Sequence, residues 1–278
     1  MRIGGGILKP YKNPDEWLRL VKDLKYSAVL VPVSSDASAE EKKAYLDYSK
    51  KYDLLIGEIG IWKNSLSPDE KERSEAIRFS QEQLALAEEM GACCCVNISG
   101  SRGAIWDGCY EDNYSEDTYA LIVDVIRQII DSVNPRRTFY TLEPMPWMHP
   151  DSPDDYLKMI KDIDRKAFGV HLDYTNMISS IDKYLYKKQF IRECFHKLGP
   201  YIKSIHAKDV VLENGLPCRI KEVNPGEGTV DYADVLRLTE ALGSDMPLFV
   251  EHMNTYEEYF HAVSFLRNIA NEEKILIK

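Results

Sequence analysis

Short apolar runs alternate with amphipathic segments along the whole chain, and this alternation limits the fold more than any other feature of the sequence. Eight such runs occur, and most are continuously apolar. That pattern is typical of strands buried on both faces. The predicted strands are residues 2–7, 28–33, 54–61, 93–99, 138–145, 168–175, 202–210 and 247–253.

Helices are predicted between these strands because capping residues stand at their ends. Asn13-Pro14 and Ser67-Pro68 are typical helix starts, and Gly91 and Gly243 are typical helix ends. The predicted helices are residues 13–26, 38–52, 67–91, 115–133, 152–163, 187–199, 231–243 and 255–272.

Strict alternation of strands and helices predicts an α/β fold with a parallel sheet. Eight units in 278 residues predict a (β/α)8 TIM barrel, and no linker-like tract divides the chain, so residues 1–278 are expected to form a single domain. A doubly wound open sheet is the alternative. The glycines at 4–6 match neither GxGxxG nor a Walker loop, which argues against a nucleotide-binding sheet.

Composition narrows the possible partners and location. The net charge of −10 argues against a general nucleic-acid binder and gives no support for an anionic membrane surface as partner. No apolar run approaches the ~20 residues that span a bilayer, and the first residues lack the apolar core of a signal peptide. A cytoplasmic protein is expected. Cys93, Cys94 and Cys95 are interpreted as small buried hydrophobic residues of a reducing compartment.

Four metal-competent side chains stand at the ends of four consecutive predicted strands. They are Glu143, Asp173, His206 and Glu251. In a (β/α)8 barrel the carboxyl ends of the strands form the catalytic face. Three carboxylates together resist ionisation unless a cation joins them, and oxygen ligands with one imidazole suit Mn²⁺, Mg²⁺, Co²⁺ or Fe²⁺. A metal site is predicted; separate helix caps and ion pairs are the alternative.

Motifs around these residues resemble the xylose isomerase-like barrel superfamily, in particular its sugar phosphate isomerase/epimerase branch, typified by tagatose 3-epimerase-like enzymes. The motifs are LEP at 142–144, HLDYTN at 171–176, IHAKD at 205–209, NPGEG at 224–228 and VEHM at 250–253. The resemblance implies that Glu143, Asp173, His206 and Glu251 bind a divalent metal, often Mn²⁺. It also implies that Glu143 and Glu251 act as acid and base.

The expected activity is therefore that of a metal-dependent isomerase or epimerase of carbohydrate metabolism. Its substrate would be a ketose or keto-sugar. Removal of a proton next to a carbonyl creates an enediolate, whose charge a metal ion stabilises. A carboxylate on either face can take or return that proton.

Other functions share parts of this chemistry. A C-glycoside deglycosidase catalytic subunit would use the same proton abstraction as a lyase on 3-oxo-glucosides of aromatic aglycones, in complex with a small β-rich subunit. Asn176, where several epimerases carry a histidine, and His149 favour this alternative. An abasic-site endonuclease needs several zinc ions and a DNA-binding face, which an acidic chain does not favour. A non-enzymatic barrel and a homo-oligomeric state also stay open.

Further candidates lie near the predicted metal site. His149, on the Pro-rich loop after Glu143, is a candidate additional base. Asp209 is a candidate for orienting a neighbouring ligand. His252 should face the helix layer, because it alternates with Glu251 along a strand. The candidate substrate contacts are Glu58, Trp106, His171, Asn176, Lys208 and Arg219.

Overall fold

The computed structural model describes residues 1–278, and its strands confirm the predicted (β/α)8 arrangement. Eight strands alternate with helices and belong to one sheet, in the order β1-β10-β7-β6-β5-β4-β3-β2. The strands are β1 (Arg2–Gly5), β2 (Ala28–Leu30), β3 (Leu55–Gly60), β4 (Cys94–Asn97), β5 (Phe139–Leu142), β6 (Phe168–Leu172), β7 (Ile202–Ala207) and β10 (Pro247–Val250).

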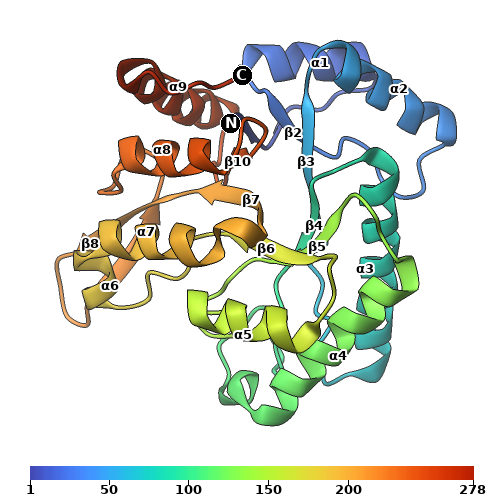
Figure 1. The fold of residues 1–278 in the computed structure, drawn as a ribbon, viewed down its shortest axis with the longest axis vertical. Coiled ribbons are helices and arrows are strands. Elements are labelled where there is room, and N and C mark those ends of the chain that lie inside the picture. The colour runs from blue at the N-terminus through green and yellow to red at the C-terminus, as the bar shows by residue number, and fades with distance from the viewer. The chain divides into compact units, whose positions relative to one another are not determined.

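Helices follow the strands as predicted, with one short α-helix and two 3₁₀ turns in addition (Figure 1). The α-helices are α1 (Pro14–Asp23), α2 (Ala39–Lys51), α3 (Glu70–Met90), α4 (Glu116–Val133), α5 (Pro153–Ile163), α6 (Ile181–Leu185), α7 (Lys187–Leu198), α8 (Tyr232–Leu242) and α9 (Tyr256–Glu273). Short 3₁₀ turns lie at η1 (Glu111–Tyr114) and η2 (Gly199–Tyr201). The sequence patterns did not predict α6 as a separate helix.

The cap residues explain where most helices begin. The Asn13 side chain accepts a hydrogen bond from the Glu16 N–H, and Ser38 and Ser152 cap α2 and α5 in the same way. The helix predicted from Ser67 is an exception, because Asp69 is its cap and α3 begins at Glu70.

The packing divides the chain into two compact units, which are described separately. Unit 1 comprises Met1–Gly57, Asp173–His196 and Ser204–Lys278, and unit 2 comprises Glu58–Leu172 and Lys197–Lys203. The predicted single domain over residues 1–278 stays a prediction.

Unit 1 contains both ends of the strand order. β10 pairs in parallel with β1 on one side and with β7 on the other. The Ser27 N–H, at the start of β2, donates to the Ile3 carbonyl of β1 at 2.8 Å, so the first and last strands of the order meet. Helices α8 and α9 pack together beside these strands (Figure 1).

The ring of Phe249 leaves no room for a side chain at two positions of unit 1, and both are glycines. A Cβ atom on Gly4 would lie 2.6 Å from the Phe249 ring, and one on Gly57 would lie 2.5 Å from it. Both distances are too short for real Cβ contacts, so the aromatic ring fills space that only glycine leaves. Gly4 and Gly57 therefore both serve packing around Phe249.

Unit 2 consists of the parallel strands β3, β4, β5 and β6 with α3, α4 and α5. Neighbouring helices of this unit pack on one another, in the green and teal part of Figure 1. Tyr156 of α5 is fully buried, and its hydroxyl donates to the Leu142 carbonyl at 2.7 Å and the His171 carbonyl at 3.0 Å. One side chain thus joins the ends of β5 and β6.

The predicted strand at residues 202–210 is wrong at its end. β7 stops at Ala207, and β8 (Asp209–Glu213) pairs antiparallel with β9 (Arg219–Val223) as a separate hairpin in unit 1. The Asn214-Gly215 pair between them is a recognised hairpin signal that the strand–helix alternation concealed.

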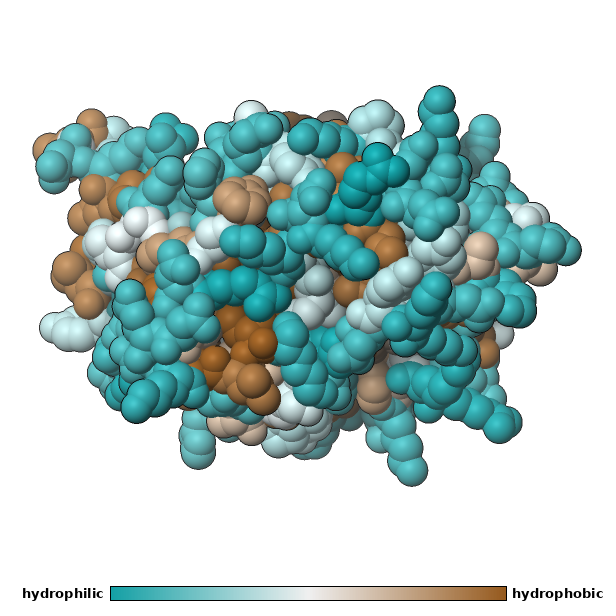
Figure 2. Space-filling model, turned by 90° about the horizontal axis from the view of Figure 1, so that it is seen from above, coloured by the Kyte–Doolittle hydropathy of each residue, from teal (hydrophilic) through white to brown (hydrophobic).

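Hydrophilic side chains cover most of the face drawn in Figure 2, with small hydrophobic groups between them. Among the large hydrophobic residues, Leu216 at the hairpin tip is 99% exposed. None of the helices combines the length and apolar character that a membrane span requires.

Glu88, near the end of α3, fixes the loop that leads into β5. Its carboxylate accepts hydrogen bonds from the backbone N–H groups of Arg136, Arg137 and Thr138 at 2.9–3.1 Å. Burial opposes ionisation, but these hydrogen bonds outweigh it and lower the pKa of Glu88 to about 2.

We predict that Glu88→Gln lowers the free energy of unfolding at pH 7 by roughly 1–3 kcal/mol. Because the folded-state pKa lies below the unfolded value of about 4.5, the stabilisation is present above pH 4.5 and is lost toward pH 2. Urea titrations of both proteins at several pH values between 7 and 2.5 check this. A difference that stays constant over that range would contradict it.

Candidate metal centre

Three of the predicted metal ligands meet within unit 1. Asp173 directly follows β6, His206 lies in β7 and Glu251 directly follows β10. Their ligand atoms lie within 4.8 Å of one another. His206 Nδ1 is 2.9 Å from Glu251 Oε2 and 4.0 Å from Asp173 Oδ2. The structure therefore places these three predicted ligands next to one another at strand ends.

The donor set fits a divalent cation. Two carboxylates and one imidazole are ligands for Mn²⁺, Mg²⁺, Co²⁺ or Fe²⁺, whereas structural zinc sites favour thiolates. Ligands about 2.1 Å from a metal ion lie roughly 3–4 Å from each other, close to the spacing of this cluster. Asp173 and His206 are also buried, which limits competition from water.

Lys208 brings a positive charge to the same oxygens. Its side chain is 1% exposed, and Nζ lies 2.8 Å from Asp173 Oδ2 and 2.7 Å from Glu251 Oε2. Burial alone would raise the pKa of Glu251, but His206 and Lys208 outweigh it and hold that pKa well below its usual value. A divalent ion at this cluster therefore shares its carboxylate ligands with an ammonium group.

Glu143 lies in unit 2, directly after β5, as its sequence position predicts. It is buried, and its backbone N–H donates to the Asn97 carbonyl of β4 at 2.8 Å. The end of β5 therefore has a fixed position.

Glu58 of β3 and His171 of β6 also belong to unit 2, and they form a pair. Glu58 Oε2 lies 3.4 Å from His171 Nδ1, and both side chains are buried. Cys94, opposite Glu58 in the β3–β4 register, is fully buried, which agrees with its interpretation as a hydrophobic residue. Two separately predicted substrate contacts are thus neighbours.

His149 has well-defined partners on its Pro-rich loop in unit 2. Its Nδ1 lies 2.7 Å from Asp155 Oδ2. Its ring meets those of Tyr114 and Tyr119 edge-on, each with a centroid separation of 5.1 Å. The imidazole is therefore held in one orientation by a carboxylate and two aromatic rings.

The other candidate substrate contacts occupy different settings. The Asn176 N–H donates to Asp173 Oδ1 at 3.0 Å, and the Asn176 amide oxygen lies 3.5 Å from Lys208 Nζ. Trp106 is half-buried on the loop after β4. Arg219 begins β9, is 71% exposed and pairs with Glu213 at 3.7 Å. Only Asn176 and Lys208 of this set therefore contact the cluster in unit 1.

His252 departs from its prediction. β10 ends at Val250, and His252 has a left-handed backbone with φ 62°, so strand alternation does not apply to it. Its Nε2 lies 3.5 Å from Glu251 Oε2, and its Nδ1 lies 2.9 Å from Glu222 Oε1 of β9. The hydrogen bond with Glu222 raises the pKa of His252. Sequence reasoning missed Glu222, since only the hairpin pairing reveals its position.

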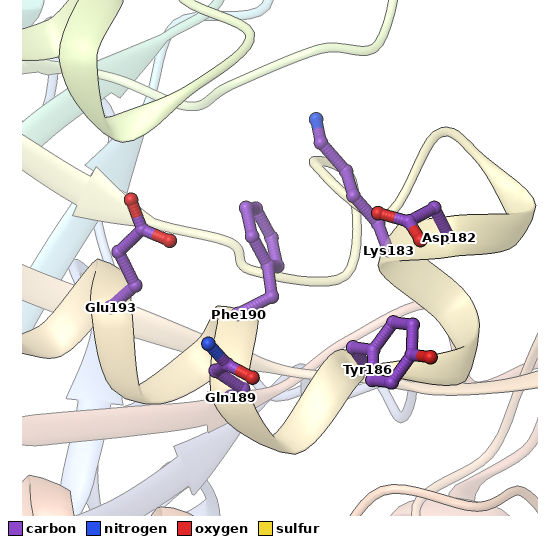
Figure 3. Close-up of a pocket in the computed structure, with 6 residues that line it drawn as sticks. All are labelled: Asp182, Lys183, Tyr186, Gln189, Phe190 and Glu193. Atoms are coloured by element: carbon purple, nitrogen blue, oxygen red, sulfur yellow. The ribbon is translucent and has the colours of Figure 1, made fainter.

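A surface hollow of about 320 Å³ lies elsewhere in unit 1, on α6 and α7 (Figure 3). None of its lining residues belongs to the metal cluster. They are Asp182, Lys183, Tyr186, Gln189, Phe190 and Glu193. Acidic, basic and aromatic side chains alternate around it, so the hollow lacks the convergent donor set of a catalytic site.

Residues 18–269 match the sequence profile of the xylose isomerase-like TIM barrel family. The chain belongs to this family, as its motifs predicted. Comparison with curated protein sequences finds no match.

Solved structures of the same fold include sugar epimerases. An L-ribulose 3-epimerase is 13% identical with a TM-score of 0.70, covering 98% of this chain and 95% of the other. A 3-keto-D-glucoside 4-epimerase from E. coli is 15% identical with a TM-score of 0.69, covering 96% and 99%. A family member from Mycobacterium smegmatis in complex with magnesium is 16% identical with a TM-score of 0.68, covering 94% and 90%.

We predict that Lys208→Met lowers the free energy of unfolding by roughly 3–5 kcal/mol in the presence of a chelator, because the buried Asp173 and the partly buried Glu251 lose their ammonium partner. Mn²⁺ should then raise the melting temperature of the variant more than that of the wild type. Thermal melts with EDTA and with Mn²⁺ measure both effects. Lys221→Met, an exposed change on β9, is the control. Equal metal-induced shifts in variant and wild type would contradict the shared-ligand interpretation.

Proposed function

We propose that this protein is a divalent-metal-dependent sugar isomerase or epimerase. It removes a proton from the carbon next to the carbonyl of a ketose or keto-sugar. The observation that carries the proposal is the cluster of Asp173, His206 and Glu251 at strand ends in a xylose isomerase-like barrel. Epimerases among the similar structures, and magnesium in another of them, support the reaction class and the metal.

Glu143 is proposed as the fourth ligand, beside Asp173, His206 and Glu251. A (β/α)8 barrel gathers the carboxyl ends of its strands on one face, and Glu143 follows β5 as Asp173 follows β6. The proposed ion is Mn²⁺, although the same ligands accept Mg²⁺, Co²⁺ or Fe²⁺. When bound, the ion supplies Lewis-acid stabilisation of the negative charge on the substrate oxygen.

Glu143 and Glu251 are proposed as the groups that exchange the proton. One carboxylate accepts the proton from carbon, and the other carboxyl returns a proton. The low pKa of Glu251 keeps this side chain ionised at neutral pH. His149 is proposed as an additional base, because Asp155 fixes its imidazole in the way that carboxylates orient catalytic histidines.

The remaining predicted contacts are proposed to hold the substrate. Lys208 and Asn176 offer an ammonium and an amide beside Asp173. Glu58 and His171 offer a buried hydrogen-bonding pair. Trp106 offers a ring for stacking on a sugar, and Arg219 offers five donors on the hairpin.

The lyase alternative rests only on Asn176 and His149, whereas the sugar epimerases among the similar structures favour isomerase or epimerase chemistry. Both reactions begin with removal of the same proton, so deuterium exchange alone does not distinguish them. The test must also identify the product.

We predict that Mn²⁺-loaded protein incorporates deuterium next to the carbonyl of D-tagatose, D-fructose or a 3-oxo-glucoside in heavy water, and that EDTA abolishes this exchange. NMR of the substrates measures the exchange and the product. Glu251→Gln should slow it by about 10²–10⁴-fold, whereas Glu257→Gln, an exposed change on α9, should have no effect. Metal-independent exchange, or none with any of these sugars, would refute the proposal, and release of an aglycone would identify a lyase.

We further predict that Glu143→Gln weakens Mn²⁺ binding at least about 10-fold, since one anionic ligand is lost. Isothermal titration calorimetry of purified metal-free protein measures the dissociation constant. The matched control is Glu88→Gln, which removes the α3 carboxylate that binds the loop just before β5. An unchanged dissociation constant in Glu143→Gln would exclude Glu143 from the ligand set.

A further inference from the structure

Two residues with Cβ atoms adopt left-handed backbone conformations where no helix end accounts for them. Five of the seven non-glycine residues with positive φ lie within two residues of a helix end, where this conformation is ordinary: Lys25, Asp53, Asn134, Asp164 and Lys274. The other two, Trp62 and His252, follow the strands β3 and β10. Unfavourable backbone geometry outside helix ends gathers at functional sites.

The left-handed backbone at His252 directs its imidazole toward the candidate metal cluster. An extended residue after Glu251 would point away from it. With φ 62°, His252 instead places Nε2 3.5 Å from Glu251 Oε2, while its side chain stays 58% exposed. The ring therefore stands between the candidate metal ligands and solvent.

Glu222 holds the other side of this ring. Its Oε1 lies 2.9 Å from His252 Nδ1, a good hydrogen-bond distance, and it comes from β9 of the hairpin. A Glu222 carboxylate can only accept, so Nδ1 carries the proton and Nε2 is directed toward the cluster. The distance of 3.5 Å from Nε2 to Glu251 is too long for a strong hydrogen bond, so a further polar group can bind Nε2.

The hairpin that carries Glu222 is firmly anchored beside the cluster. The buried side chain of Asp209 accepts hydrogen bonds from the N–H groups of Gly226 at 3.2 Å and Val230 at 2.8 Å. A Cβ atom on Gly228 would lie 2.2 Å from Asp209 Oδ1, so this glycine is required for the turn to close on the carboxylate. Glu222 pairs with Val210, next to Asp209.

We propose that His252 and Glu222 form a hydroxyl-binding pair at the edge of the metal centre. His252 contacts a hydroxyl of the sugar substrate through Nε2, and Glu222 is its positioning residue. The β8–β9 hairpin thereby takes part in substrate selection. This inference rests on the proposed function, because it names a contact to the same substrate.

The chemistry fits a sugar hydroxyl better than a charged group. A hydroxyl can donate its hydrogen to the lone pair of His252 Nε2, which Glu251 leaves available at 3.5 Å, while the hydroxyl oxygen can still accept a hydrogen bond from another donor. An anionic substrate group would meet the carboxylates of Glu222 and Glu251 on either side of the ring.

The test separates this contact from folding, because glycine and asparagine both tolerate a left-handed backbone. His252→Gly should keep or raise the melting temperature, yet lower kcat/KM about 10- to 100-fold on whichever sugar the Mn²⁺-loaded wild type exchanges. His252→Asn, which restores a polar group, should recover part of that loss.

Glu222→Met tests the positioning role on the same sugar, because methionine removes the acceptor for Nδ1–H. It should raise KM about 3- to 10-fold with a smaller change in kcat, because a misoriented imidazole binds less well. Glu213→Met, a change of an exposed acid on the same hairpin, is the matched control. Long-range ¹H–¹⁵N NMR should show the Nδ1-protonated form of His252 in the wild type and its loss in Glu222→Met. The His252 signal is identified by its absence in His252→Gly.

The outcomes are distinguishable. Unchanged kcat/KM in His252→Gly, while the wild type exchanges substrate, would overturn the pair and leave the proposed function intact. If His252→Gly loses Mn²⁺ affinity to the same extent as kcat/KM, His252 acts by positioning the proposed ligand Glu251. That result would also overturn the hydroxyl contact. Absence of exchange in the wild type with any of the sugars would remove both proposals.

Discussion

One carboxylate oxygen, Oε2 of Glu251, organises the candidate site. Lys208 Nζ lies 2.7 Å from it and His206 Nδ1 lies 2.9 Å from it. Bringing Glu251 next to Asp173 in a buried cluster is electrostatically unfavourable unless positive charge accompanies them. Lys208 supplies one such charge from within the chain, and a divalent cation supplies two. The balance between these two sources of positive charge would decide how tightly this candidate site binds a metal ion.

The barrel and three of its candidate ligands could be read from the sequence because both follow from local rules. Continuously apolar runs mark parallel strands, and a strand ends where a polar residue interrupts the run. Asp173 and Glu251 stand at such interruptions, and the parallel sheet brings their ends together. Most helix starts were equally local, since Asn13, Ser38 and Ser152 act as caps through their own neighbouring N–H groups.

Features that depend on distant contacts or on single backbone angles could not be predicted in this way. Alternation placed His252 on the helix side, but one residue with positive φ reversed its direction. Glu222 lies 30 residues from His252, so their pairing follows only from the hairpin register. Sequence motifs also could not predict two side-chain pairs, because a motif considers each residue separately. These pairs are His149 with Asp155 and Glu58 with His171.

The hairpin has a consequence for how proteins of this kind diversify. The side chain of Asp209, the first residue of β8, holds the base of the hairpin by accepting hydrogen bonds from two backbone N–H groups, and these bonds do not depend on the other side chains of β8 and β9. Its tip is exposed, with Leu216 in contact with solvent over almost its whole surface. Changes in the length of such a tip cost little loop-closure entropy. Mutations in the hairpin can therefore alter which ligands it contacts, while the barrel and its candidate metal ligands stay unchanged.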